Sequence, residues 1–235
     1  SGAGLKRTRI KICGVTDAKS AWSAVDAGAD AVGLVFVNGS PRQVDVQRGR
    51  EIAAMLPAFV EPIGLFVNDD PDHIREVSRE LGLHTVQLHG QETPEEVSAL
   101  SPLRVIKAFA FEPREVSAAL SPWRGGCDNL AAILFDAPPP DSKASHAGGG
   151  GRTFDWSALA ALEHAGILAD LGPMILAGGL TPDNVAEAIR TLSPYAVDVS
   201  SGVESERGVK DAALITSFCQ EVQQEDIRRA QVTNR

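Results

Sequence analysis

Two side chains that end short apolar runs could act as an acid and a base. Asp136 follows the apolar residues 131–135, and burying a carboxyl group there is costly unless the group is paired or functional. Desolvation favours the protonated form of a carboxyl group, which suits a proton donor. Cys13 precedes Gly14, and its thiol could accept a proton only if its pKa fell from about 8.5 toward neutral. The structural alternatives are a salt bridge or helix cap for Asp136 and a small buried side chain for Cys13.

Two glycine-containing turns near the end of the chain could bind an anion. Gly178 and Gly179 follow one apolar run, and Ser200, Ser201 and Gly202 follow the next. Glycine lets a backbone approach a phosphate closely, and the N-terminus of a following helix attracts negative charge. Each turn alone could be an ordinary connection, but two in consecutive units favour a phosphate site.

Polar side chains near the ends of other apolar runs could complete a binding site. Arg42 follows Pro41 and could hold a carboxylate through two parallel hydrogen bonds, or remain a solvated surface charge. His89 could contact a ligand or be a core histidine whose hydrogen bonds are satisfied. Side chains alternate along a strand, so three pairs are expected to share a face: Gln87 with His89, Asp198 with Ser200, and Lys11 with Cys13.

These residues need a scaffold that brings the ends of several strands together. Short apolar runs alternate with helical patterns along the chain, and runs that are apolar on both faces are typical of buried parallel strands. The pattern predicts strands at residues 9–13, 31–36, 62–67, 85–89, 104–108, 131–136, 174–177 and 196–199. It predicts helices at residues 17–27, 46–56, 72–81, 94–100, 112–120, 156–165, 182–192 and 210–223.

Eight such pairs predict an α/β fold, a single (β/α)8 TIM barrel, with an open doubly wound sheet as the alternative. Active sites of such barrels lie at the carboxyl ends of the strands, and the loops after strands seven and eight often bind phosphate. The polar side chains above should therefore converge. Five helices carry start signals: Thr16 before the first, Pro71 before the third, Thr93 before the fourth, Asp155 before the sixth, and Thr181 with Pro182 at the seventh.

The barrel is expected to occupy residues 9–220. Residues 1–8 contain no apolar segment typical of a secretory signal, so we interpret them as an N-terminal extension or a cloning remnant. Residues 221–235 are polar, which predicts a frayed helix end and a disordered tail. Residues 137–153, rich in Pro, Ser and Gly, follow the sixth strand and could be a mobile lid or a flexible connector.

The composition bounds the partners and the compartment. The chain has 235 residues and a net charge of −9, which argues against nucleic acid but not against an anionic small molecule held by a few local donors. Three cysteines without paired or metal-like spacing favour free thiols and a reducing, cytoplasmic location. No run reaches the roughly 18 apolar residues of a membrane span, so we expect no membrane partner.

Short motifs occur in a fixed order between residues 10 and 218. They are KICGVT from Lys11, GADAVG from Gly28, SPR ending at Arg42, GLFVN from Gly64, VQLHG from Val86, FDW from Phe154, LAGGL from Leu176 and VDVSSGVE from Val197. Each motif alone is weak, but the ordered set is specific, and with it nearly the whole chain resembles the phosphoribosylanthranilate isomerase family. The departure from the family pattern is local: Gly150 stands where the family often has Thr.

The resemblance implies a (β/α)8 barrel of tryptophan biosynthesis that converts N-(5-phosphoribosyl)anthranilate into 1-(2-carboxyphenylamino)-1-deoxyribulose 5-phosphate. This Amadori rearrangement needs no cofactor and no metal, and its partner is a phosphorylated small molecule; the protein could be a monomer or a homodimer. The resemblance implies that Asp136 is the general acid and Cys13 the general base. It also implies two binding regions: the anthranilate side with Arg42, Gln87, His89 and Asp198, and the phosphate side with Gly178, Gly179, Ser200, Ser201 and Gly202.

Three other functions fit parts of the pattern. The related phosphoribosyl isomerase of histidine biosynthesis pairs two aspartates, and Cys13 argues against it. A non-catalytic phosphosugar-binding barrel would not need both Cys13 and Asp136. A hydrolase with a cysteine nucleophile would need a histidine base near Cys13, and His89 is the candidate that can be placed at a strand end.

Overall fold

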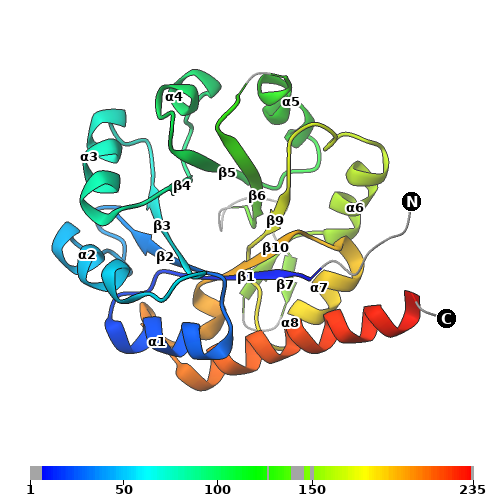
Figure 1. Cartoon of the computed structure of the whole chain (residues 1–235). Coiled ribbons are helices and arrows are strands. Elements are labelled where there is room, and N and C mark those ends of the chain that lie inside the picture. The colour runs from blue at the N-terminus through cyan, green and yellow to red at the C-terminus, as the bar shows by residue number, and fades with distance from the viewer. Residues whose placement is uncertain (1–6, 126, 139–145, 149–150, 234–235) are drawn as a thin grey trace.

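Eight parallel strands close into a barrel, and helices pack around its outside (Figure 1). The computed structural model describes residues 7–125, 127–138, 146–148 and 151–233. β1 pairs with β2 on one side and with β10 on the other, which closes the barrel, confirms the predicted fold and excludes the open sheet. The barrel strands are β1 (Arg9–Cys13), β2 (Ala31–Val35), β3 (Glu61–Phe66), β4 (Thr85–Leu88), β5 (Arg104–Ala110), β6 (Leu130–Asp136), β9 (Met174–Leu176) and β10 (Ala196–Val199).

The helices begin largely where cap residues predict. Thr93 and the glutamate three residues later form the predicted capping box of α4. The N-cap of α1 is Asp17, which accepts a hydrogen bond from the Ser20 N–H, and not Thr16 as predicted. The helices are α1 (Ala18–Ala27), α2 (Val46–Met55), α3 (Pro71–Leu81), α4 (Pro94–Ala99), α5 (Val116–Leu120), α6 (Trp156–His164), α7 (Val185–Leu192) and α8 (Ala212–Thr233).

The start of α7 differs from the prediction. The helix begins at Val185, so Pro182 precedes it instead of occupying its first position. The side chain of Asn184 explains the difference, because it accepts a hydrogen bond from the Thr181 N–H and donates one to the Gly179 carbonyl. These two bonds hold residues 179–184 as a turn at the mouth of the barrel before the helix can start.

The apolar core has two parts. The larger part lies between the strands and the surrounding helices. The smaller part lies inside the barrel and is built largely from small or branched side chains: Ala31, Ile63, Ile106, Ala108, Ala132, Leu134, Ile175, Ala177 and Ala196. Small side chains leave room in the barrel for the polar residues described below.

The C-terminal segment is ordered, contrary to the prediction of a disordered tail. Helix α8 continues to Thr233 and runs past α1 and α7 (Figure 1). Glu225 is buried and accepts a hydrogen bond from Arg190 of α7 at 2.8 Å. Asp226 accepts hydrogen bonds from the Thr8 backbone and hydroxyl at 2.6 and 2.7 Å. Both carboxylates therefore attach residues beyond 220 to the barrel.

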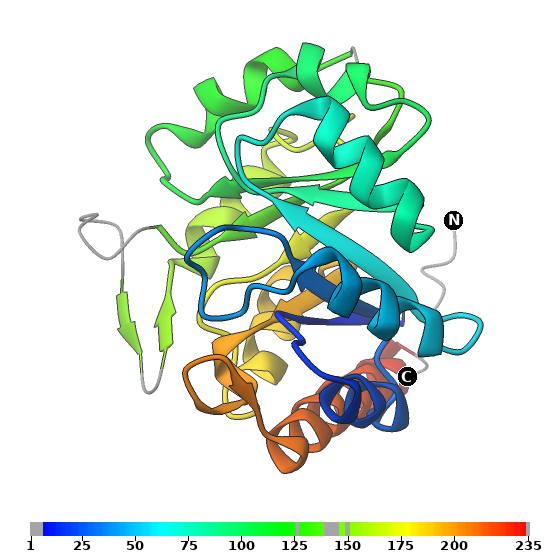
Figure 2. The same ribbon diagram turned by 90° about the vertical axis from the view of Figure 1, so that its left-hand side faces the viewer.

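Two small hairpins interrupt the βα pattern, and neither was predicted. β7 (His146–Gly148) and β8 (Gly151–Thr153) pair after β6 and stand away from the barrel (Figure 2). Part of the segment 137–153, for which the sequence allows a lid or a connector, lies outside the described residues. β11 (Glu204–Glu206) and β12 (Val209–Lys210) pair after β10, and a short 3-10 turn (Ser201–Val203) precedes them.

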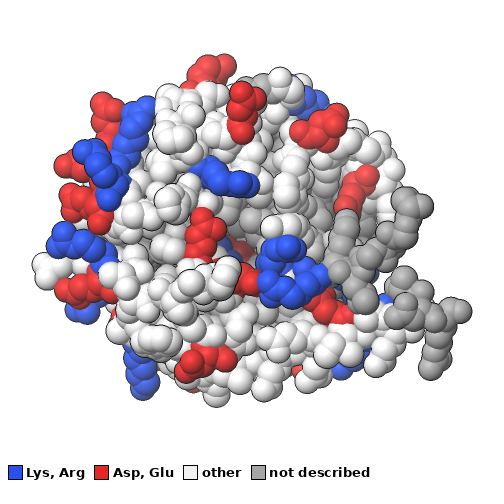
Figure 3. All heavy atoms as spheres, viewed as in Figure 1, with Lys and Arg blue, Asp and Glu red and all other residues white. Residues whose placement is uncertain are grey.

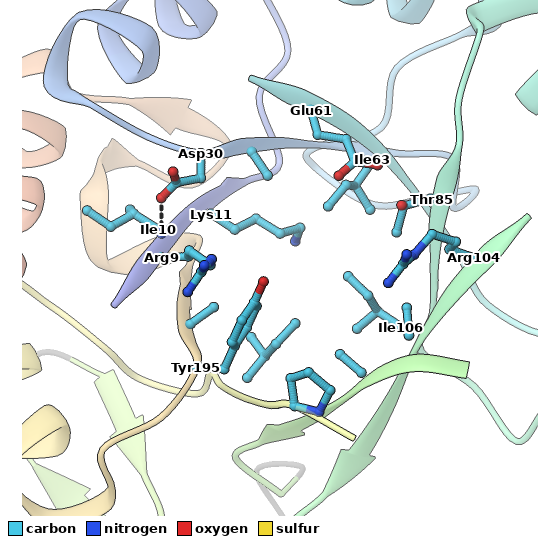
Figure 4. Close-up of a pocket in the computed structure, with 16 residues that line it drawn as sticks. Arg9, Ile10, Lys11, Asp30, Glu61, Ile63, Thr85, Arg104, Ile106 and Tyr195 are labelled. Carbon is cyan, nitrogen blue, oxygen red and sulfur yellow. Dashed lines mark hydrogen bonds between the residues drawn. The ribbon is translucent and has the colours of Figure 1, made fainter. Parts of the chain in front are cut away.

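The amino-terminal end of the barrel has its own pocket, of about 380 Å³ (Figure 4). Arg9 lies over the ring of Tyr195 at its rim, 4.2 Å from the ring centroid, and Arg104 and Glu61 lie across the opening.

On the molecular face in Figure 3, basic and acidic side chains of the described residues are intermixed rather than segregated. Within the same part of the chain, no helix combines the length and apolarity needed to cross a membrane.

Candidate active site

All the site residues predicted from the sequence line one cavity at the carboxyl ends of the strands. The cavity has a volume of about 380 Å³ and opens at the opposite end of the barrel from the pocket of Figure 4. Parallel strands bring their carboxyl ends to the same end of a barrel, which is why residues so distant in sequence meet here. The predicted residues in its wall are Cys13, Arg42, Gln87, His89, Asp136, Gly178, Gly179, Asp198, Ser200, Ser201 and Gly202.

Asp136, the last residue of β6, faces His89, which follows β4. Its Oδ2 lies 3.1 Å from His89 Nε2, and its Oδ1 accepts a hydrogen bond from the Ala137 N–H at 2.7 Å. The side chain is 31% exposed, so the carboxyl group is less buried than predicted and opens onto the cavity. Asp136 is thus placed to exchange a proton with a molecule bound there.

Gln87 of β4, two residues before His89, contacts the other ring nitrogen of that histidine. Its Nε2 lies 3.1 Å from His89 Nδ1, so Gln87, His89 and Asp136 form a chain of contacts across β4 and β6. The Gln87 Oε1 atom is buried and has no hydrogen-bond partner in the described part of the chain. Exchanging the amide oxygen and nitrogen, which occupy similar volumes, would let Oε1 accept a hydrogen bond from Nδ1–H. The orientation of this amide therefore decides which ring nitrogen of His89 carries a proton.

Cys13 ends β1 and is buried at the edge of the cavity. Burial raises the pKa of its thiol, and the positive charge of Lys11 opposes that effect only in part. The condition stated for a basic thiol, a pKa lowered toward neutral, is therefore not met by burial and Lys11 alone. Removal of the thiol from water is the reason, because a thiolate loses its solvation there.

Arg42 does hold a carboxylate through two hydrogen bonds, but that carboxylate belongs to Glu204. Arg42 Nε donates to Oε1 at 2.7 Å and Nη2 donates to Oε2 at 2.9 Å. Lys210 donates to the same Oε1 at 2.7 Å, and the Gly208 N–H donates to Oε2. Although burial acts in the opposite direction, hydrogen bonds from Arg42, Lys210 and Gly208 lower the pKa of Glu204 to about 2.

Glu204 and Lys210 support the cavity wall through bonds to Arg42 and Ser200, and neither role was predicted from the sequence. Lys210 is buried and donates hydrogen bonds to the carbonyl and the hydroxyl of Ser200, which brings a positive charge to the turn after β10. Both residues belong to the unpredicted hairpin β11–β12. The signal that could have found them is the pair of opposite charges flanking a Gly, six residues apart, directly after the last strand.

The turns after β9 and β10, for which the sequence predicts an anion cradle, border the cavity. The Gly178 and Gly179 N–H groups make no hydrogen bond to the described part of the chain. Both residues have positive φ angles, +83° and +65°, which favour glycine. A Cβ atom at Gly178 would overlap the Ala137 backbone, and one at Gly202 would overlap the Leu180 carbonyl oxygen. Glycine is therefore needed at both positions for the loops after β6, β9 and β10 to pack together.

The fold and the cavity together define a (β/α)8-barrel enzyme whose cavity wall contains a thiol, a carboxyl group and two glycine-containing turns. The N-(5'-phosphoribosyl)anthranilate (PRA) isomerase family model matches residues 10–221, and the chain belongs to this family.

Individual relatives agree with the family assignment. The N-(5'-phosphoribosyl)anthranilate isomerase of Geobacter sulfurreducens is 47% identical over 210 residues, which cover 89% of this chain and 96% of the relative. A crystal structure of phosphoribosyl anthranilate isomerase in complex with reduced 1-(o-carboxyphenylamino)-1-deoxyribulose 5-phosphate superposes with a TM-score of 0.78. That structure is 36% identical and covers 92% of this chain and 99% of its own. The dimeric enzyme from Thermotoga maritima, solved as monomers, has a TM-score of 0.77, 35% identity and the same coverage.

Proposed function

We propose that Asp136 and Cys13 are the acid and the base with which this chain isomerises N-(5-phosphoribosyl)anthranilate in tryptophan biosynthesis. The observation that carries the proposal is the placement of both groups, from β6 and β1, in the wall of one cavity beside an anion cradle. Membership of the isomerase family gives the substrate and the product.

Proton transfers account for the whole rearrangement. Asp136 donates a proton to the furanose ring oxygen, the C1–O bond breaks, and the nitrogen lone pair forms an iminium with C1. The iminium acidifies the C2 hydrogen, and the Cys13 thiolate removes it to leave an enolamine. Protonation at C1 and loss of the enol proton then give the aminoketone. Because the iminium withdraws electrons strongly, a weak base such as a thiolate is sufficient.

The cavity wall suggests how the substrate is oriented. The phosphate would lie on the free N–H groups of Gly178 and Gly179 and near Ser200, Ser201 and Gly202, where the charge of Lys210 adds attraction. The anthranilate carboxylate would meet Arg42, whose Nη1 group is not engaged by Glu204. Gln87 and His89 line the same cavity.

Two substitutions test the assigned roles. Asp136→Asn keeps the shape of the side chain and removes the proton, so kcat should fall by about 10²–10⁴ with the fold intact. Cys13→Ser should be similarly impaired, because a hydroxyl is a far weaker base near pH 7. The assay follows the loss of substrate fluorescence from freshly prepared phosphoribosylanthranilate, with circular dichroism as the folding control. Near-normal turnover by either variant would remove that residue from its role.

The phosphate cradle and the substrate choice are tested separately. Inorganic phosphate should compete with the substrate and raise the apparent KM while leaving kcat unchanged. Absence of competition at high phosphate concentration would contradict the anion cradle. An assay of the related ribonucleotide substrate of histidine biosynthesis, run beside phosphoribosylanthranilate, tests whether one chain accepts both.

We infer a homodimer in the cytoplasm. The dimeric Thermotoga maritima relative supports the assembly. The free thiols of Cys13, Cys127 and Cys219 support a reducing compartment. Light scattering after size exclusion should give twice the chain mass, and a chain mass at micromolar concentration would refute the dimer.

A further inference from the structure

A buried ion pair lies directly beneath Cys13. Lys11 of β1 and Asp198 of β10 are partners in the strand register, and their side chains point into the barrel. Lys11 Nζ donates a hydrogen bond to Asp198 Oδ1 at 3.0 Å, and the two side chains are only 4% and 7% exposed. Figure 4 shows the Lys11 side chain running from β1 into the barrel interior. Burying two charges here is costly, so the pair calls for an explanation beyond fold stability.

The ammonium group of this pair is next to the thiol. Cys13 is opposite Gly33 in the strand register, and Lys11 is two residues earlier on the same face of β1. A Cβ atom at Gly33 would lie 2.7 Å from Cys13 Sγ and 3.1 Å from Lys11 Nζ. Both atoms therefore border the same small volume, which is open because residue 33 has no side chain.

The charged groups around Cys13 differ in how strongly they could stabilise its thiolate form. Asp198 and the ammonium of Lys11 lie on the barrel side, and Arg42 and Lys210 lie on the side of the hairpin β11–β12. Arg42 and Lys210 share the single carboxylate of Glu204, so these three groups together keep one net positive charge. Of the three cations, Lys11 is the one whose ammonium group lies with Cys13 Sγ beside Gly33. Although burial acts against it, the charge of Asp198 raises the pKa of Lys11 to about 12, so Lys11 stays positive at neutral pH. Lys11 is thus the cation that faces the thiol most directly.

We propose that Lys11 is a positioning residue whose ammonium group is the counter-cation of the Cys13 thiolate, and that Asp198 holds this ammonium in place. The inference rests on the proposed role of Cys13 as the base. It changes the role expected for Asp198, whose Oδ1 is bonded to Lys11 and not free for the substrate. A thiolate beside a fixed cation can form without bulk water, which is what a buried base requires.

The test measures thiolate formation without any turnover. Wild type, Lys11→Met and Asp198→Asn are treated with iodoacetamide between pH 6 and pH 10, and alkylation of the Cys13 peptide is followed by mass spectrometry. Lys11→Met removes the cation and should slow Cys13 alkylation at pH 7.5 at least about tenfold, with a midpoint at higher pH. Asp198→Asn keeps an oxygen that can accept from Lys11 and removes the negative charge, so its midpoint should move to lower pH.

The proposal predicts that the pH midpoint of Cys13 alkylation rises in Lys11→Met and falls in Asp198→Asn. An ion pair with a merely structural role would not produce these opposite shifts. Lys19→Met, at an exposed lysine of α1, is the matched control and should leave the profile unchanged. The buried Cys219 should stay protected in every variant that folds. If Lys11→Met does not fold, Asp198→Asn decides alone. An unchanged midpoint or an upward shift in Asp198→Asn would overturn the proposal, as would an unchanged profile in folded Lys11→Met.

The two proposals fail in different ways. Loss of the expected alkylation shifts, with isomerase activity and the Cys13→Ser defect intact, would refute Lys11 as the counter-cation and leave the acid–base assignment standing. Full activity of Cys13→Ser would refute the base assignment whatever the alkylation profile shows.

Discussion

Replacing Glu204 by Gln should destabilise the protein in a pH-dependent way. Glu204 is the shared partner of Arg42 and Lys210, and its side chain is only 5% exposed. Glutamine keeps the shape but carries no charge, so two cations would remain close together with no anion between them. A broken buried ion pair typically costs about 3–5 kcal/mol.

The pKa of Glu204 gives an independent magnitude. It falls from 4.5 to about 2, despite burial, because of the hydrogen bonds from Arg42 and Lys210. Each pKa unit corresponds to about 1.4 kcal/mol, so the ionised carboxylate contributes about 3 kcal/mol to stability. The contribution is present in full above the unfolded-state pKa near 4.5 and is lost as the pH falls toward 2. At pH 3.5 about 1.4 kcal/mol of it should already be gone.

Urea unfolding followed by circular dichroism measures this difference. The free energy of unfolding of Glu204→Gln should be about 3 kcal/mol below that of the wild type at pH 7, and the gap should narrow between pH 4.5 and pH 3.5. Glu206→Gln is the control, because Glu206 lies exposed in the same hairpin. A gap below about 1 kcal/mol at pH 7, or one that does not change with pH, would refute the argument.

Three further substitutions address the site and the fold. Gly202→Ala forces a Cβ atom against the Leu180 carbonyl, so KM should rise at least about tenfold and the melting temperature should fall; an unchanged KM would show that this turn does not support the cradle. His89→Ala removes the contact with Asp136, and kcat should fall about tenfold or more with little change in KM, whereas a rise in KM alone would favour substrate binding by His89. Deleting residues 224–235 removes the Glu225 and Asp226 contacts, so the urea midpoint should drop. An unaffected midpoint would show that these contacts do not stabilise the barrel.

The barrel could be predicted because its signals are local and repeated. Each strand is a short apolar run, and caps such as Thr93 mark the helices. Because a parallel barrel brings the carboxyl ends of all its strands to one end, the fold also predicts where the polar residues that follow the strands lie. For this reason the sequence predicts that residues as distant as Cys13 and Ser200 line one site, as they do.

What the sequence could not supply was pairing between residues far apart in the chain. Nothing near Arg42 indicates that Glu204 occupies its guanidinium group, because the two meet only after the barrel closes. The polar residues 221–233 look like a solvated tail, yet Glu225 is buried against Arg190. The exposure of a charged residue depends on its tertiary partners, which composition and periodicity do not reveal.

The seam between β1 and β10 has a consequence for synthesis of the protein. The two strands that meet there carry residues 187 positions apart, as the Lys11–Asp198 contact shows. On the ribosome, one edge of β1 therefore has no ladder partner until nearly the whole chain has emerged. Nascent chains stalled before β10 should consequently be captured by chaperones that recognise unpaired strand edges, while release of the completed chain allows the ring to close.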